Sequence, residues 1–208
     1  MLAFLKGIEY NYSIPFLWNV TMNIFYLDPT PSICARFHTN KHIISQLKES
    51  CQLLSTAHRV LDGAEYSDAS SGRNIKRWKL DNPTLDSLLY KSTHLNHPSA
   101  VWARQTSENY MWLCELLTEL CKEYTYRYGK IHKCEQIGLV DMLYTNIPKN
   151  IKRNQFTEPT PAMPDECIVK GDSITSYRNY YNMKKQHLAS WKGKVNSRTI
   201  PNWYEEIV

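Results

Sequence analysis

Two long stretches without glycine or proline constrain the fold of this chain more than any other feature. The segments 32–61 and 99–128 lack both residues, and their apolar side chains recur at the spacing of an amphipathic helix. The chain of 208 residues has only seven glycines, which is few for the many tight turns of an all-β sandwich or barrel. We therefore predict a mainly α fold.

Prolines and capping residues set the expected helix boundaries. We predict a first helix from about Pro31 to Leu61, with a break near residues 39–40 where Asn40 caps a second segment, and an end at Asp62-Gly63. The other predicted helices span residues 85–91, 98–129 and 172–191. The long helix begins at Pro98 and ends at Gly129, which favours the left-handed conformation of a helix C-terminus.

The segments between these helices are predicted to be irregular. Residues 64–84 are polar and are expected to form a loop, and residues 137–172 contain four prolines and are expected to form a long loop with one short helix. Residues 23–27 are a short apolar run, which predicts a buried strand or extended arm. We expect residues 22–208 to form a single-domain helical bundle with a short N-terminal extended arm and long irregular loops. Residues 1–21 are expected to be an extension upstream of a native start at Met22.

Net charge is concentrated near the C-terminus. The chain carries +5 in total, and residues 170–198 contain seven basic residues against one acidic residue. A concentrated basic patch is typical of a protein that binds a polyanion such as nucleic acid, and the alternative is a basic surface that serves solubility.

The cysteines and the hydropathy exclude several classes of protein. The six cysteines form no C-x-x-C pair and have no histidine at zinc-ligand spacing, so we expect reduced thiols, no metal and no cofactor. No segment approaches the roughly 20 apolar residues of a membrane span. A cytoplasmic protein without membrane contact is therefore expected. Walker, G-x-G-x-x-G, H-E-x-x-H and G-x-S-x-G motifs are also missing from the sequence.

The first predicted helix carries a polar strip opposite its apolar side chains. Ile44 is one of those apolar side chains, so we expect it to lie in the core. The strip consists of His42, Ser45, Glu49, Gln52 and Thr56. At 100° per residue these side chains fall within about 80° of one another. A single carboxylate beside an imidazole, with Lys41 and Lys48 at the edges to keep it ionised, suits acid–base chemistry on an anionic substrate. The alternative is a polar face that packs against another helix or loop.

A second candidate cluster precedes the helix that begins at Pro98. It consists of His94, Asn96, His97 and, inside the helix, Arg104. Free N–H groups at a helix N-terminus favour phosphate, and histidines there bind phosphate or act as acids. The alternative is that these residues cap the helix and fill a turn.

Aromatic and basic residues alternate in a third cluster. Tyr177, Tyr181, Lys184, Leu188 and Trp191 follow helical spacing and are predicted to belong to the core. Arg178 and Lys185 fall on another face. The pattern predicts a helix that positions phosphates, with Arg178 and Lys185 as the binding residues.

Two short segments resemble a known family. Asn40-Lys41-His42 and Lys48-Glu49, together with the ending Pro201-Asn202-Trp203-Tyr204, resemble the pyrimidine-dimer DNA glycosylases, the bacteriophage endonuclease V group. The resemblance covers residues 22–49 and 201–204. The chain from Met22 is also similar to small phage proteins that share its Lys-His, Asn-His-Pro and Tyr-Arg-Asn-Tyr-Tyr features.

This resemblance implies a concrete mechanism. In the family the α-amine exposed by removal of the initiator methionine attacks the deoxyribose, which would assign the nucleophile to Asn23 and the catalytic carboxylate to Glu49, with His42 beside it. An α-amine has a reference pKa of about 8, against about 10.4 for lysine, so more of it is neutral at pH 7. The partner would be DNA with a damaged, extruded pyrimidine, in the host cytoplasm if the chain is phage-encoded.

Other functions stay open at this point. Without that amine, the nucleophile would be a lysine such as Lys41, or a water activated by Glu49. The chain could instead be a non-catalytic phage factor that binds nucleic acid or a host protein. It could also be an enzyme that acts on a phosphorylated nucleotide, with residues 94–97 as its phosphate site.

Overall fold

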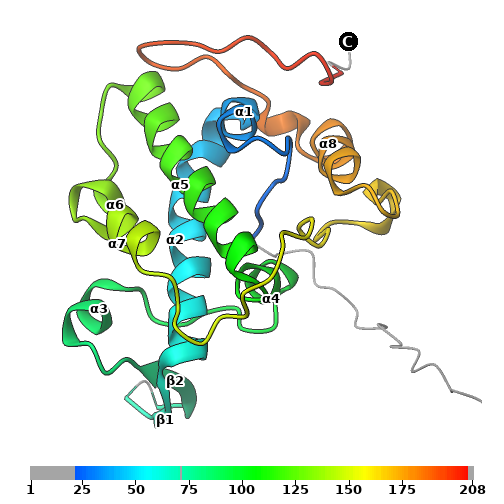
Figure 1. Cartoon of the computed structure of the whole chain (residues 1–208). Helices are drawn as coiled ribbons and strands as arrows, with labels where there is room; N and C mark the ends of the chain where they lie inside the picture. Colours follow the sequence, from blue (N-terminus) through cyan, green and yellow to red (C-terminus); the bar gives the residue numbers. More distant parts are fainter. Residues whose placement is uncertain (1–21, 71, 206–208) are drawn as a thin grey trace, which may run out of the picture.

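The computed structural model describes residues 22–70 and 72–205, and it is mainly α-helical, as predicted (Figure 1). The helices are α1 (Pro31–Phe37), α2 (Asn40–Asp62), α3 (Pro83–Leu88), α4 (Pro98–Ala103), α5 (Ser107–Tyr128), α6 (Lys133–Gln136), α7 (Leu139–Thr145) and α8 (Ser173–Lys184), with 3-10 turns η1 (Asp165–Cys167) and η2 (Gln186–Leu188). The predicted upstream extension, residues 1–21, lies outside the described residues.

Helices α2 and α5 form the centre of the core. They pack against each other, α1 packs on α5, and α4 and α7 pack on α2 (Figure 1). Leu47 and Leu54 of α2 and Leu113 and Leu117 of α5 are completely buried, and each such side chain stabilises the fold by about 1.5–3 kcal/mol. Ile44, predicted to be in the core, is 47% exposed, because no other segment among the described residues covers its side of α2.

The predicted break in the first helix is confirmed. Helix α1 ends at Phe37 and α2 begins at Asn40. The cap of α2 is Thr39 and not Asn40 as predicted, since the Thr39 hydroxyl accepts the His42 backbone N–H. The Asn40 side chain instead donates to the Lys192 carbonyl at 2.7 Å and thereby holds the C-terminal segment.

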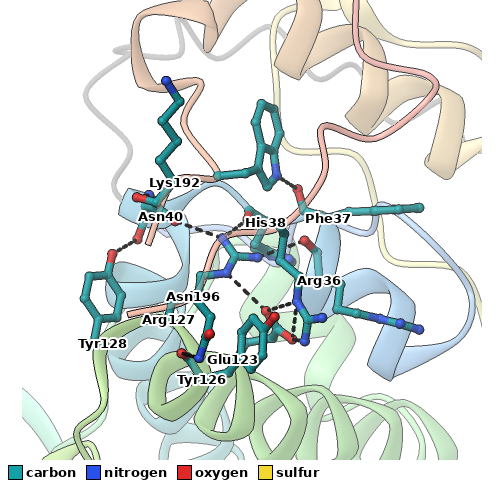
Figure 2. A network of polar contacts seen from close by, with 12 residues as sticks. Arg36, Phe37, His38, Asn40, Glu123, Tyr126, Arg127, Tyr128, Lys192 and Asn196 are labelled. Atoms are coloured by element: carbon teal, nitrogen blue, oxygen red, sulfur yellow. Dashed lines mark hydrogen bonds and ion pairs between the residues drawn. The ribbon is translucent and has the colours of Figure 1, made fainter. Parts of the chain in front are cut away.

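A completely buried arginine of α5 holds this break together. The Arg127 guanidinium donates to the carbonyls of Arg36 at 2.9 Å and His38 at 2.8 Å (Figure 2). The last carbonyls of a helix have no partner within the helix, so the guanidinium satisfies groups that would otherwise be buried and unpaired. Glu123 neutralises Arg127 at 3.1 Å and also binds Arg198 of the C-terminal segment.

Residues 64–84 were predicted to form a loop, and this is wrong in part. They contain an antiparallel hairpin of β1 (Ala64–Asp68) and β2 (Ile75–Lys79), with Ala64 opposite Lys79. The hairpin is largely exposed, so its sequence lacks the alternation of a half-buried strand. Arg59 of α2 fixes it by donating to the Trp78 carbonyl and by pairing with Asp86 at 2.7 Å.

Three other boundaries differ from the prediction. The helix expected over 98–129 is divided into α4 and α5, because Thr106 caps a new helix by accepting the Asn109 N–H. Helix α5 ends at Gly129, whose φ of 65° is in the left-handed region, as predicted. Helix α3 lies at 83–88, and α8 ends at Lys184 before the turn η2, where a helix to residue 191 was expected.

The C-terminal tail docks by its aromatic rings. The Trp203 ring lies 5.8 Å from that of Phe37 and 5.9 Å from that of Tyr181, and Tyr204 lies 5.0 Å from Trp191. All six cysteines are unpaired and buried. In the part of the chain that is described, no helix is long and apolar enough to cross a membrane.

Candidate functional site

The polar strip runs along α2 for about 21 Å, since 14 steps of about 1.5 Å separate His42 from Thr56. Its two ends are buried, with His42 6% exposed and Thr56 inaccessible, while Ser45, Glu49 and Gln52 in the middle are partly exposed. The strip therefore packs against other segments at its ends and is open to solvent around Glu49. His38, which would join it on an unbroken helix, belongs to the break and is buried.

The Glu49 carboxylate receives two hydrogen bonds on one oxygen. Its Oε2 accepts the backbone N–H of Asn23 at 2.9 Å and the Nε2–H of Gln46 at 2.7 Å. Asn23 and Glu49 are 26 residues apart in sequence. The fold thus brings together the two residues that the family resemblance names as nucleophile and catalytic carboxylate.

Burial raises the pKa of Glu49 above its ordinary value. The hydrogen bonds from Asn23, Gln46 and Ser45 and the charge of Lys185 act in the opposite direction and do not offset it. Desolvation is the largest effect on this pKa, and the cation that favours the ionised form is Lys185, the residue after α8. The expected effect of Lys41 and Lys48 remains a prediction. A carboxyl with a raised pKa is suited to proton transfer near neutral pH.

The N-terminal arm is fixed beside this carboxylate. The Asn23 side chain donates to the Ala162 carbonyl at 2.9 Å, so the arm is tied to the loop that precedes α8. Phe25 has φ of +51°, a strained conformation for a bulky residue, and such strain is often found at functional sites. Its ring stacks on that of His42 at 4.2 Å. The arm, predicted as a strand or extended segment, is thus buried without regular secondary structure.

His42 has the contacts of a positioning residue. Its Nδ1 lies 2.6 Å from the Tyr181 hydroxyl, and its ring supports Phe25. Burial lowers the pKa of His42 well below its ordinary value, so the ring is neutral at pH 7. The predicted role of this imidazole in proton transfer remains a prediction.

The third cluster contains residues of the buried core and one cation, Lys185, that acts on Glu49. Tyr177, Tyr181 and Trp191 are buried, as predicted, whereas Lys184 is exposed and pairs with Glu166 at 2.9 Å. The stretch 177–185 also contains the two predicted phosphate-binding residues. Arg178 donates to the Leu27 carbonyl at 3.0 Å and lies over the Trp203 ring, so it holds the arm and the tail. Lys185, over the Tyr180 ring at 4.8 Å, is the one of the two whose charge acts on Glu49.

The second cluster lies at the other end of the strip. The Thr93 N–H donates to the Thr56 hydroxyl at 3.2 Å, which joins the segment before α4 to α2. His97 caps α4, since its Nδ1 accepts the Ser99 N–H at 3.2 Å. His94 and Asn96 are exposed beside it. Arg104 donates to the carbonyls of Ala100 and Leu95, so its guanidinium is held by the backbone of this turn.

Two residues of the site around Glu49 are not among the predicted ones. Gln46 was recognisable from the sequence, because it lies three residues before Glu49 on the same helix, where side chains meet. Phe25 carried no such indication, since its ring meets His42 of a separate segment.

Comparison with known proteins finds no neighbour: no family model, no curated protein and no solved structure matches this chain. The resemblance to the DNA glycosylases therefore stays a prediction. It depends on the residues at 22–49 and 201–204 and on the arrangement around Glu49.

Proposed function

We propose that this protein is a DNA glycosylase for damaged pyrimidines, with Glu49 as its catalytic carboxylate. The observation that carries the proposal is the 2.9 Å contact between the Asn23 backbone nitrogen and the Glu49 carboxylate. An amine at that nitrogen would have the carboxylate beside it as a proton acceptor and as a counter-charge for a cationic sugar. The raised pKa of Glu49 supports the first of these functions, because it makes this carboxylate a better base than that of an exposed glutamate.

The lyase form of the reaction depends on the mature N-terminus. If Asn23 is the first residue, its neutral amine attacks C1′, the bond from C1′ to the base breaks, and the base leaves and takes up a proton. The C1′–O4′ bond of the sugar ring then breaks, O4′ takes up a proton, and the C1′ carbon becomes a protonated imine, which allows β-elimination of the 3′ phosphate. In a chain that continues upstream, the same nitrogen is an amide without a nucleophilic electron pair. The reaction is then hydrolysis by a water that Glu49 activates, without a covalent intermediate.

The surroundings of Glu49 have the dimensions and charge that suit a DNA strand. The open part of the strip, from Ser45 to Gln52, rises about 10 Å, which corresponds to roughly three nucleotides at 3.4 Å per nucleotide. Lys41 and Lys48 are exposed along it, and Lys185 lies at the end near the arm. Much of the basic charge of residues 170–198 is used within the protein, since Lys184 pairs with Glu166 and Arg198 with Glu123. We therefore place the DNA on the strip and not along α8.

Borohydride trapping on abasic-site DNA tests the proposal. The chain that begins at Asn23 should form a covalent adduct under reduction, and its Glu49→Gln variant should not. The full chain should release the damaged base without being trapped. A chain that begins at Asn23 with an acetylated amine is the matched control, since it keeps every side chain. If neither chain releases a base from irradiated duplex DNA, the glycosylase proposal is wrong.

Two coarser features belong to the same proposal. We infer that residues 22–208 form a single helical domain, because one buried cluster contains side chains from Met22 to Tyr181. The six unpaired thiols agree with the cytoplasmic location that we propose.

A non-catalytic nucleic-acid binder is the second candidate, favoured by the cations along the strip. It would bind DNA with unchanged affinity after Glu49→Gln and would release no base.

A further inference from the structure

A cavity of about 700 Å³ lies between the hairpin and the segment that leads into α4. Residues 75–77 of β2 line one side of it and residues 92–98 line the other. It adjoins the end of the polar strip, because Thr93 in its wall is hydrogen-bonded to Thr56. In Figure 1 this region is at the hairpin end of α2, opposite the end at which α8 and the tail lie.

Three buried polar atoms of the cavity wall have no hydrogen-bond partner among the described residues. They are Ser92 Oγ, His97 Nε2 and Arg77 Nε. Ser92 is only 4% exposed. Buried polar atoms in folded proteins are nearly always hydrogen-bonded, so three such atoms around one cavity indicate an occupant that supplies their partners.

All three atoms are hydrogen-bond donors on residues that line the cavity. Because His97 Nδ1 accepts the Ser99 N–H, the ring proton must reside on Nε2. Burial lowers the pKa of His97 to about 4, which keeps the ring neutral with that single proton. The Arg77 Nε–H always donates, and the Ser92 hydroxyl is able to donate. A water molecule would offer two acceptor sites and two protons, whereas a phosphate oxygen only accepts and so matches a set of donors better.

The charges around the cavity agree with an anion. The lining contains Lys76 and Arg77 and no aspartate or glutamate. Lys76 pairs with exposed Glu65 at 2.9 Å, and Arg77 lies 4.0 Å from Asp68, which is also 4.0 Å from Lys91. The Arg77 atom nearest Asp68 is Nε, at a distance beyond hydrogen-bond range. These carboxylates are not among the lining residues, so the charged side chains of the lining are cations.

We propose that this cavity is a phosphate-binding site at the end of the polar strip. Its distance from the catalytic carboxylate also indicates which phosphate it takes. From Glu49 to Thr56 the helix rises about 10 Å, which is the length of about three nucleotides of a DNA strand. Resting on the proposed function, the ligand is therefore a backbone phosphate about three nucleotides from the damaged one. A free nucleotide would offer the same chemistry.

The Ser92→Ala variant tests the site in the full chain. Because the Ser92 hydroxyl has no protein partner, its removal leaves nothing unsatisfied and should not destabilise the fold. His97→Asn is the second variant, since asparagine still caps α4 but lacks a donor at the position of Nε2. Ser50→Ala is the matched control: its hydroxyl is equally buried and unpartnered, but it lies on α2 outside the cavity lining.

The readout is the Kd for a labelled abasic-analogue duplex by fluorescence anisotropy at fixed salt, and the Kd for inorganic phosphate and thymidine monophosphate by thermal shift. Ser92→Ala and His97→Asn should each raise the duplex Kd roughly tenfold, and Ser50→Ala should not change it. If only the Kd for monophosphate and phosphate rises, the site takes a free nucleotide, and the DNA assignment is wrong.

The two proposals can fail separately. If the wild-type chain binds no duplex but binds phosphate in a manner sensitive to Ser92→Ala, the glycosylase proposal fails and the phosphate site stands. If Ser92→Ala and His97→Asn leave the affinity for every one of these ligands unchanged, or if the wild-type chain binds none of them, the phosphate site is refuted.

Discussion

Replacing Glu49 by glutamine should separate catalysis from stability in this protein. The Asn23 N–H and the Gln46 side chain both donate to Oε2, and a glutamine amide oxygen accepts the same two bonds. Burial raises the pKa of Glu49, so its proton is held more tightly in the folded than in the unfolded chain. The stability that this carboxyl contributes is present below its ordinary pKa and lost as the pH rises, so at pH 7 the ionised group opposes folding.

The magnitudes follow from these contacts. A hydrogen bond to a charged group contributes about 1.5–3 kcal/mol and a neutral one about 1 kcal/mol, so each of the two bonds weakens by about 1 kcal/mol. Removal of a half-buried charge acts in the opposite direction. We expect the free energy of unfolding of Glu49→Gln to stay within about 1 kcal/mol of wild type, while base release slows by about 10²–10⁴-fold.

Single-turnover base release from damaged duplex DNA and urea unfolding, on the same preparations, measure both effects. Glu115→Gln is the control, because Glu115 is exposed on α5 and should change neither quantity. Undiminished base release by Glu49→Gln would refute the catalytic role. A loss of about 3 kcal/mol in unfolding free energy would show instead that the carboxylate mainly holds the arm in place.

Three further predictions concern the framework around the site. Arg127→Met should lower the unfolding free energy by about 3–5 kcal/mol, because it leaves two buried carbonyls without their partner and removes one of the two cations that bind Glu123; a urea midpoint close to wild type would contradict this. Burial lowers the pKa of His38 to about 4, so stability from its neutral form is present above pH 6.5 and lost as the pH falls toward 4. The loss is at most about 3 kcal/mol, and His38→Gln should flatten the decline of stability between pH 7 and 4.5; an unchanged slope would exclude this role. Gly63→Ala should cost about 1–3 kcal/mol, since its Cβ would lie 2.6 Å from the Arg59 carbonyl oxygen, and thermal melting at the wild-type temperature would show that the turn has room.

Local patterns were sufficient for features that depend on neighbours within a few residues. The two main helices, the break near residue 39, the left-handed Gly129 and the polar strip follow from helical spacing and capping residues. The hairpin and the division of α4 from α5 were not predictable in this way. A mostly exposed ribbon has no apolar alternation, and Thr106 becomes a cap only because the chain turns there to meet residue 152.

The sequence alone determined that α2 carries His42 and Glu49 on one face, because a helix places residues seven apart on nearly the same side. Only the tertiary structure decided what those residues meet. The arm brings the Asn23 nitrogen to Glu49 because Asn23 is also bound to the loop at Ala162. Burial by these distant segments raises the pKa of Glu49, against the effect expected from the lysines beside it in sequence. Periodicity reports which side of a helix a residue occupies, but desolvation depends on which remote segment covers that side.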